Sequence, residues 1–467
     1  MVFSSLVFIC VFLPAVFLLY YIMPGRRMKN MLLIVASLLF YSYGEPVYII
    51  LMLFSILFNY LMGIGVERTR SQRKFVLTLA VLGNLGMLGF FKYAVFVIGN
   101  LNQIFGIDIP VPEIRLPIGI SFFTFQALSY VIDVYREQGK AQKNLWKLIL
   151  YISFFPQLIA GPIVKYHDIE EQLDHRKENL DDIRAGMARF ILGLGKKVLI
   201  ANTMAVAADA VFSLPVSSVN VCVSWLGAIA YMMQIYYDFS GYSDMAIGLG
   251  MMFGFYFKEN FYHPYGAASI QDFWRRWHVS LSTWFKEYLY IPLGGNRKGK
   301  VRTCVNKIIV FFLTGLWHGA NWTFVLWGLY HGFFLLLEQF LPKKKVFSPL
   351  RHLYTVLVVC VGFVIFRAES LSQAFMMITK MFTDFRMDAV SMSIFWEQMT
   401  PLFIVTLAAA ILFSIPVRER IVSAAAKNVM MKGAVTWIGL VGSVFILVLS
   451  VLNLAGGTYN PFIYFRF

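Results

Sequence analysis

Charged residues and cysteines are both scarce in this chain, and each shortage narrows what the protein can be. Only 14% of its 467 residues are charged, whereas a soluble globular protein has about 25%. The four cysteines lie far apart and form no CxxC pair, so neither a zinc site nor a disulfide framework is predicted. We expect each of them to be a small buried apolar residue. They are Cys10, Cys222, Cys304 and Cys360.

The chain also lacks the short motifs of several enzyme classes. It has no HExxH or other paired-ligand spacing, which argues against a metalloprotease and predicts no metal site. It has no Gly-x-Ser-x-Gly elbow. The glycine-rich segment PLGGNRKGK lacks the GxxxxGK[ST] pattern of a P-loop. No internal repeat and no low-complexity segment is visible.

Apolar residues are in excess: 59% of the chain is hydrophobic and the mean hydropathy is +0.67. Runs of about 17–25 apolar residues signal transmembrane helices. We predict an all-α polytopic membrane protein with about eleven transmembrane helices, plus re-entrant or interfacial helices. The runs are roughly 3–23, 30–43, 46–65, 75–99, 116–134, 145–163, 186–212, 221–257, 305–318, 321–341, 352–366, 400–416 and 434–453.

The basic residues form short clusters between these runs, which accounts for the net charge of +16 without nucleic acid. Basic loops at 25–30, 67–74 and 136–147 alternate with loops that have no excess of Lys or Arg. By the positive-inside rule this predicts an N-terminus outside and basic loops in the cytoplasm. The first run has no basic segment before it and no small-residue cleavage site, so we expect a retained helix and not a signal peptide.

Several runs fit a single straight span poorly. The segment 145–163 contains Pro156 and a Gly-Pro pair, which break helices and are tolerated at membrane depth where they line a protein cavity. We expect the run 221–257 to hold two segments. The stretch 268–285 is too polar for lipid and too aromatic for a loop, which predicts a re-entrant or interfacial helix. The runs 305–318 and 321–341 hold about 34 residues, fewer than the roughly 40 that two spans need, so one or both should be short or broken.

The stretch 271–339 is predicted to hold the functional site, because it places two histidines among Trp, Phe and Leu. Ionisable residues at membrane depth are costly and suggest a site. His318, in LTGLWHGANW, could act as a general base, since a neutral imidazole can take a proton from a hydroxyl. The alternative is a histidine hydrogen-bonded between helices.

His278 lies in FWRRWHVSLS and is either a second site histidine or a group that orients the substrate. The alternative is an interfacial helix whose Arg275 and Arg276 hold lipid phosphates, with tryptophans at headgroup level. We expect five neighbours to line the site, namely Trp274, Arg276, Trp277, Trp317 and Asn321.

The basic segment that follows could receive the phosphates of a soluble donor such as coenzyme A. We assign the approach of that donor to Lys298, Lys300 and Arg302. The simpler alternative is an inside-facing basic turn. The other histidines are weaker candidates, and His331 is too far from His318 for one helix face to present both to a metal.

Two stretches together carry a family resemblance: QDFWRRWHVSLSTWFKEYLYIPLGGNRKG and LTGLWHGANWTFVLWGLYHG. With SLLFYSYGEP, PIGISFFTFQALSYVIDVYR, FFPQLIAGPIVKY and YDFSGYSDMAIGLGMMFGF, they cover most of the chain. The sequence resembles the membrane-bound O-acyltransferase (MBOAT) family. It is most similar to the bacterial branch with the alginate O-acetyltransferase membrane subunit and the D-alanyl-lipoteichoic acid transferase.

The resemblance implies one integral-membrane acyltransferase domain over 1–467, with helices around a central funnel. It implies His318 as the family's near-invariant histidine and His278 as the second. It implies no bound cofactor: the acyl group comes from a cytoplasmic thioester, acetyl-CoA or an acyl carrier protein, which is a substrate. The acceptor is a hydroxyl of an extracytoplasmic polysaccharide or teichoic acid, and the location is the bacterial inner membrane.

We therefore predict an O-acetyltransferase for a secreted or cell-wall polysaccharide, acting directly or through an extracytoplasmic acyltransferase partner. The length and the terminal FIYFRF favour the alginate-acetylation type. One alternative is D-alanyl transfer to teichoic acid from a carrier protein. Another is a transporter, since broken helices and polar residues at the midplane suit one as well. A transporter predicts an internal repeat, and none is found.

The aromatic tail at 454–467 should dock on the protein or the membrane surface, because its aromatic side chains are costly to leave in water. It could be an anchor at headgroup level. The sharper hypothesis is that the Tyr464 phenol is acylated transiently and passes the acyl group to a partner outside.

Overall fold

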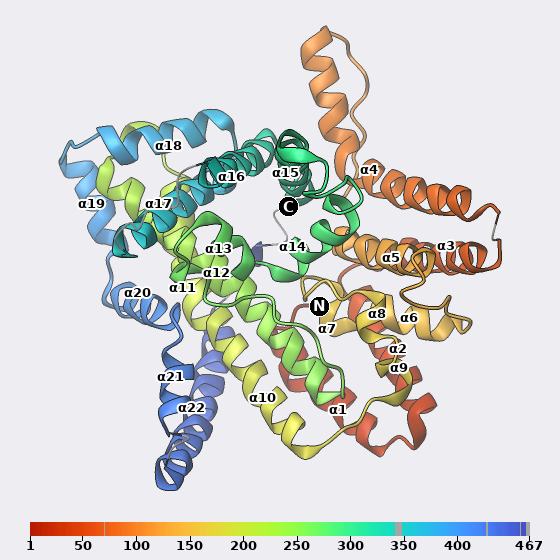
Figure 1. Cartoon of the computed structure of the whole chain (residues 1–467). Coiled ribbons are helices and arrows are strands. Elements are labelled where there is room, and N and C mark those ends of the chain that lie inside the picture. The colour runs from red at the N-terminus through yellow and green to blue at the C-terminus, as the bar shows by residue number, and fades with distance from the viewer. Residues whose placement is uncertain (70, 341–347, 426–427, 458, 464–467) are drawn as a thin grey trace. The chain divides into compact units, whose positions relative to one another are not determined.

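The computed structural model describes residues 1–467 except 70, 341–347, 426–427, 458 and 464–467, and every regular element in the described part is helical (Figure 1). This confirms the all-α fold class. The α-helices are α1 (Leu13–Ile22), α2 (Gly25–Ser42), α3 (Tyr48–Arg68), α4 (Arg73–Phe105), α5 (Ile120–Tyr135), α6 (Leu145–Ser153), α7 (Phe155–Leu158), α8 (Tyr166–Ile169), α9 (Gln172–His175), α10 (Leu180–Gly195), α11 (Asn202–Phe212), α12 (Val221–Met252), α13 (Ile270–Arg276), α14 (Val279–Phe285), α15 (Gly299–His318), α16 (Trp322–Phe340), α17 (Ser348–Arg367), α18 (Leu371–Thr383), α19 (Ala389–Gln398), α20 (Pro401–Phe413), α21 (Val417–Ala425) and α22 (Val429–Gly456). Short π-helical segments are Phe8–Phe12, Lys196–Ala201 and Lys286–Tyr290, and 3-10 turns are Val216–Ser218 and Pro264–Gly266.

Five helices of the described part are long and apolar enough to cross a membrane, or six if the bent pair α19 and α20 forms one span. They are Tyr48–Arg68, Arg73–Phe105, Leu180–Phe212, Ser348–Arg367 and Met430–Gly456. These helices are those of a multi-pass membrane protein, while the number eleven is not confirmed.

The helices divide into two compact units. The first comprises 1–190 and 245–258, and the second comprises 191–244 and 259–467. In the first unit α3, α4 and α5 pack together. A buried pair of amides joins two of them, since Asn59 and Asn84 donate to each other's side-chain oxygens at 3.0 and 2.7 Å. Such pairs satisfy polar groups that lipid cannot.

The breaks in the helices follow the sequence in one place and depart from it in two. Phe154 interrupts the segment 145–163 before Pro156, as predicted. The run 221–257 does not hold two segments, because α12 is continuous over 32 residues. Within α12, Gly241 allows a close approach of the neighbouring backbone, since an added Cβ would lie 2.7 Å from the carbonyl oxygen of Gly193.

The expectation of short or broken helices at 305–341 is also wrong. Helix α15 has 20 residues and α16 has 19, each unbroken. The reason is that α15 begins at Gly299, within the basic segment, so polar residues supply its first turns. The cysteine expectation holds only for Cys360: Cys10 is exposed, and Cys222 and Cys304 are intermediate. Cys10 belongs to an apolar helix with an uncovered face, which lipid can cover.

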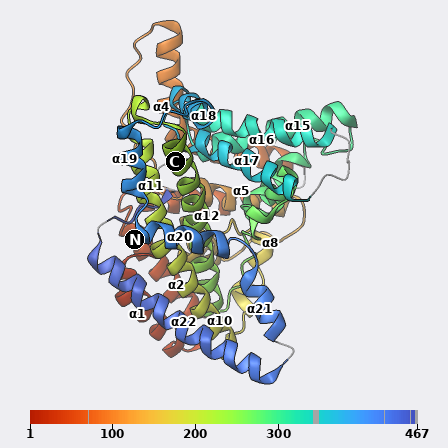
Figure 2. The same cartoon turned by 90° about the vertical axis from the view of Figure 1, so that its left-hand side faces the viewer.

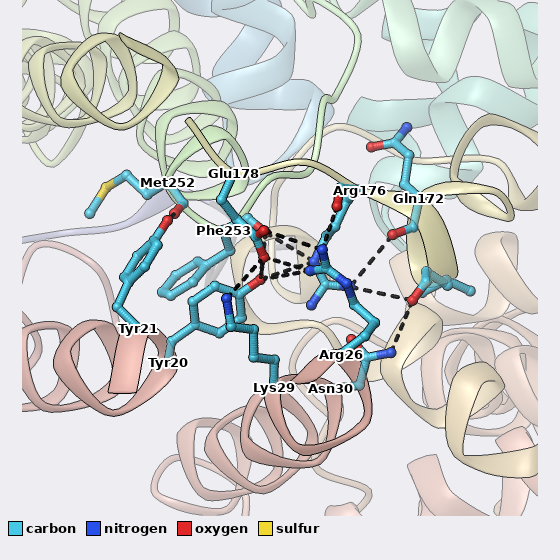
Figure 3. Close-up of polar contacts among 11 residues, drawn as sticks. Tyr20, Tyr21, Arg26, Lys29, Asn30, Gln172, Arg176, Glu178, Met252 and Phe253 are labelled. Carbon is cyan, nitrogen blue, oxygen red and sulfur yellow. Dashed lines mark hydrogen bonds and ion pairs between the residues drawn. The ribbon is translucent and has the colours of Figure 1, made fainter. Parts of the chain in front are cut away.

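A dense ionic cluster joins distant parts of the first unit (Figure 3). The Glu178 carboxylate accepts from Arg26 at 2.5 Å and from the Tyr20 hydroxyl at 2.6 Å, and Lys29 lies 3.5 Å from it. Arg176 donates to the Tyr20 hydroxyl at 3.0 Å. Burial favours the neutral acid, but the bonds from Arg26 and Tyr20 and the positive charges outweigh it, so the pKa of Glu178 falls to about 2.

This pKa predicts a pH-dependent contribution to stability. Glu178 binds its proton less tightly when folded than at its ordinary value of 4.5. Its contribution is therefore full above about pH 4.5 and is lost as the pH falls towards 2. At pH 7, Glu178→Gln should lower the free energy of unfolding by about 2 kcal/mol, a typical value for hydrogen bonds to a charged group.

Thermal unfolding of the purified protein at pH 7, 4.5 and 3 tests this, with the deficit of Glu178→Gln shrinking at the lowest pH. Glu137→Gln is the matched control, because Glu137 pairs with Arg73 at 2.8 Å but its side chain is 76% exposed. Exposed pairs contribute little. A Glu178→Gln deficit that is the same at pH 3 and pH 7 would contradict the assignment.

Candidate active site

The hairpin of α15 and α16 in the second unit positions His318 (Figures 1 and 2). The two helices pack more closely than side chains on both would allow. A Cβ added to Gly315 would lie 2.3 Å from the carbonyl oxygen of Phe324, and one added to Gly328 would lie 2.2 Å from that of Phe311. Glycine is therefore required at both positions. His318, the last residue of α15, is held against α16 as a result.

Aromatic rings surround the His318 imidazole, which is 7% exposed. Its ring centroid lies 5.0 Å from that of Trp317, 5.1 Å from that of Trp327 and 5.2 Å from that of Phe366. Such walls exclude water, and electrostatic interactions are stronger where water is excluded.

His278 directly precedes the short helix α14, two residues after α13 ends, and its backbone is strained. Its φ of 44° is in the left-handed region, which costs a side-chain-bearing residue about 1–3 kcal/mol and is concentrated at functional sites. The segment after α12 runs beside it: Val279 donates its N–H to the carbonyl of Asn260 at 3.0 Å, and Tyr262 donates to that of Arg276 at 2.9 Å. This pairing brings the Asn260 side chain to His278.

Asn260 determines which nitrogen of His278 carries the proton. The backbone N–H of Ser280 donates to Asn260 Oδ1 at 3.1 Å, so the atom at that position is an acceptor. His278 Nδ1 lies 3.2 Å from the same oxygen and must donate to it. The neutral ring therefore carries its proton on Nδ1 and a lone pair on Nε2. The Asn260 amide in turn donates to the Ser243 hydroxyl at 3.1 Å.

The two histidines come together although 40 residues separate them. Their ring centroids lie 6.5 Å apart. His278 is 1% exposed, and its Nε2 has no hydrogen-bond partner among the described residues. A buried acceptor of this kind can receive a proton or a hydrogen bond from a substrate hydroxyl. In the described part no three His, Cys, Asp or Glu side chains group as metal ligands.

The residues expected to line the site divide into two groups. Trp317 contacts both histidine rings, at 6.0 Å from His278 and 5.0 Å from His318. The ring centroid of Trp274 lies 5.6 Å from that of Trp327 and 5.1 Å from that of His331. Trp277 lies within the adjoining aromatic core, 5.2 Å from Phe363.

The remaining two are engaged elsewhere. Arg276 pairs with Asp272 at 2.9 Å. Asn321 caps the start of α16 by accepting from the N–H of Thr323 at 3.0 Å, and it also donates to the carbonyl of Glu369 at 3.1 Å. Tyr464 lies outside the described residues.

The residues assigned to the donor lie at the opposite end of α15 from His318. Lys298, Lys300 and Arg302 are all exposed. Near them is a polar cavity of about 360 Å³. Its lining residues are Gln271, Tyr290, Asn296, Thr303, Lys307 and Gln339.

Sequence reasoning missed three residues of this site. Asn260 lies 18 residues before His278, in a segment with no charge pattern or motif of its own, so only the fold identifies it. Trp327 lies within the stretch 271–339, but nothing in its spacing pointed to His318. Phe366 belongs to an ordinary apolar run.

The Asn260 bond yields a prediction with a matched control. Asn260→Ala should reduce turnover by roughly 10- to 100-fold, the loss that follows when a metal-ligating histidine loses its orienting partner. Asn260→Asp should retain most of the rate, because it keeps an oxygen acceptor for His278 Nδ1. Steady-state kinetics should show a fall in kcat with KM preserved. An equal loss in both variants would indicate a purely structural role.

Comparison with known proteins defines the class. The family model described as membrane-bound O-acyltransferase matches residues 71–379. The chain is 42% identical to a probable alginate O-acetylase of Azotobacter vinelandii over all of both chains. It is 37% identical to a peptidoglycan O-acetyltransferase of Helicobacter pylori, covering 80% of this chain and 78% of that one.

A more distant relative is a teichoic acid D-alanyltransferase of Bacillus subtilis, 30% identical over 54% of this chain and 69% of that one. The chain belongs to the membrane-bound O-acyltransferase family. It is an acyltransferase, as predicted, and membership of this family argues against the transporter alternative.

Proposed function

We propose that this protein transfers an acetyl group from a cytoplasmic thioester towards hydroxyls of an extracytoplasmic polysaccharide, directly or through a partner protein. The observation that carries the proposal is the buried pair His278 and His318, with an acceptor lone pair on His278 Nε2. The similarity over full length to an alginate O-acetylase supports the acetyl group and the acceptor class.

In the proposed reaction His318 is the general base. It takes the proton of the acceptor hydroxyl while the hydroxyl oxygen attacks the thioester carbonyl carbon. The carbon–sulfur bond then breaks, and the thiolate leaves with the electron pair and is protonated. His278 orients the substrate through its acceptor Nε2, which takes a hydrogen bond from a neighbouring hydroxyl of the polysaccharide, because the attacking hydroxyl has a single proton and gives it to His318.

The donor would approach from the basic end of α15. Lys307 lines the polar cavity there, and His318 lies eleven residues further along the helix. At 1.5 Å per residue this is about 16 Å along the axis, and Arg302, sixteen residues before His318, lies about 24 Å from it. A donor whose charged head stays at Lys298, Lys300 and Arg302 therefore needs an extended arm to present its thioester to His318, as coenzyme A and carrier proteins have.

The donor is tested with purified protein in proteoliposomes that receive labelled acetyl-CoA on the face of α15's basic end. We expect acetyl transfer to polysaccharide, and slower transfer when Lys298, Lys300 and Arg302 are all changed to Glu. Because steering is screened by salt, the deficit should be larger at low than at high ionic strength. If the deficit in acetyl transfer does not change with ionic strength, these residues only keep the loop on the cytoplasmic side and do not attract the donor.

The same assay separates the alternative. D-alanyl transfer is favoured by the similarity to a teichoic acid D-alanyltransferase. If the protein uses a D-alanyl carrier protein and rejects acetyl-CoA and acetylated carriers, the acetyl proposal fails and the alternative takes its place.

We also propose about eleven spans in the bacterial inner membrane with the N-terminus outside. Alternating basic loops support this orientation, since Lys and Arg gather on the cytoplasmic side. Single cysteines introduced into the basic loops and into the loops between them, labelled from each side of intact cells, test it.

A further inference from the structure

The segment 459–463 enters the second unit at its end: Tyr459 is 44% exposed, whereas Phe462 and Ile463 are buried. Phe462 is 6% exposed and Ile463 is 3% exposed. The Phe462 ring stacks on that of Tyr242 with centroids 4.8 Å apart. A chain end held only as an aromatic anchor at the membrane surface would not bury these residues in a helical unit.

A buried ion pair forms hydrogen bonds with the main chain of this segment. Lys197 and Asp238 are 2% and 1% exposed and lie 2.9 Å apart. Lys197 Nζ donates to the carbonyl of Pro461, and the N–H of Ile463 donates to Asp238 Oδ2 at 2.8 Å. Each member of the pair thus holds one main-chain group of the tail.

Two side-chain contacts fix the register of the segment. Asn202 donates to the Asn460 side chain at 3.2 Å, and Lys197 also donates to Asn202 at 2.9 Å. The Tyr459 hydroxyl donates to Asp209 at 2.5 Å. Because these contacts directly precede the main-chain bonds in the chain, a slip of the tail by one residue would break several contacts together.

The same turns of α12 hold both the tail and His278. Asp238 binds Ile463, while the next residue, Phe239, packs its ring 4.6 Å from the imidazole of His278. One turn later, Tyr242 stacks on Phe462. Its neighbour Ser243 accepts from Asn260, the residue that orients His278. The tail and the histidine are therefore fixed to one short stretch of a single helix.

We infer that Lys197 and Asp238 form a clamp that seats residues 459–463 beside the His278 site, and that acyl transfer requires this seating. The pair are positioning residues, since they act through the tail. A buried ion pair is a poor source of stability, because apolar residues of similar size are often as stable. Its use here is explained by the two main-chain groups, which apolar side chains could not bind.

The test is the double variant Lys197→Met with Asp238→Leu. It leaves no unpaired buried charge, so the fold should survive. Hydrogen–deuterium exchange of the full-length protein measures seating through the amide of Ile463. We expect this amide to exchange at least about tenfold faster, since one tertiary hydrogen bond is lost. Acetyl transfer should fall at least about tenfold.

The matched control is Lys196→Met with Asp244→Leu. These residues form a salt bridge of the same charge types at 2.7 Å: Lys196 directly precedes Lys197, and Asp244 lies six residues after Asp238 on α12. Tail exchange should keep its wild-type rate in this control, because the Asp238 bond to Ile463 is intact.

The expected loss of acetyl transfer rests on the proposed function, whereas the expected change in hydrogen–deuterium exchange does not. Faster exchange together with lost transfer supports the clamp. Unchanged exchange in the double variant overturns the clamp itself, and faster exchange with normal transfer overturns the need for seating. A wild-type protein that seats its tail but shows no acyl transfer would sink the proposed function and, with it, the requirement for seating.

Discussion

His318→Ala should abolish acyl transfer while the protein still inserts and purifies normally. Loss of a general base costs about 10²- to 10⁴-fold in rate. The ring lies among Trp317, Trp327 and Phe366, and alanine leaves a gap beside Trp327 and Phe366, whose ring centroids lie 5.0 Å apart and which stay in contact. Rates of labelled acetyl transfer by variant and wild type, at equal membrane expression, give the measurement.

The matched control is His352→Ala. His352 lies near the start of α17, where its Nδ1 donates to the carbonyl of Ser348 at 2.7 Å. It is not part of the site. It should transfer at the wild-type rate. His278→Ala should impair the reaction but leave a residual rate, as an orienting role implies. Wild-type acetylation by His318→Ala would overturn its assignment as the base.

Tyr464→Phe should also stop delivery of acetyl groups to the final acceptor, if the phenol relays them. A phenoxide, with a reference pKa of about 10, leaves more readily than an alkoxide, so a phenyl ester is a good onward donor. Tyr464 follows Ile463 directly, and Ile463 is buried beside α12. This proximity in the chain makes the relay compatible with the seated tail.

Mass spectrometry of the tail separates the relay from an anchor. We expect an acyl adduct on wild-type protein supplied with donor and none on Tyr464→Phe. Tyr262→Phe, at a half-exposed tyrosine of the same unit, should keep both the adduct and the activity. Normal polysaccharide acetylation in Tyr464→Phe cells, with no adduct on the wild-type tail, would leave only the anchor.

Local patterns predicted some elements well. Proline at 156 interrupts a helix because its ring removes an N–H and clashes with the preceding turn, whatever surrounds it. The polar, aromatic stretch 268–285 forms the two short helices α13 and α14, neither long enough to span. By contrast, the run 221–257 was expected to hold two segments, but α12 is continuous over 32 residues.

The sequence by itself determined that this is a helical membrane acyltransferase. It also placed His278 and His318 in the stretch 271–339, where polar and aromatic residues alternate with apolar runs. Composition, the length of apolar runs and motifs can be read from residues that are close together in the chain. Only the tertiary structure decided that Asn260 fixes the His278 tautomer and that Lys197 and Asp238 hold the tail. Those partners lie 18 to 264 residues apart in the chain. Buried polar groups must find hydrogen bonds wherever the fold places them, and no local pattern specifies which distant group will be there.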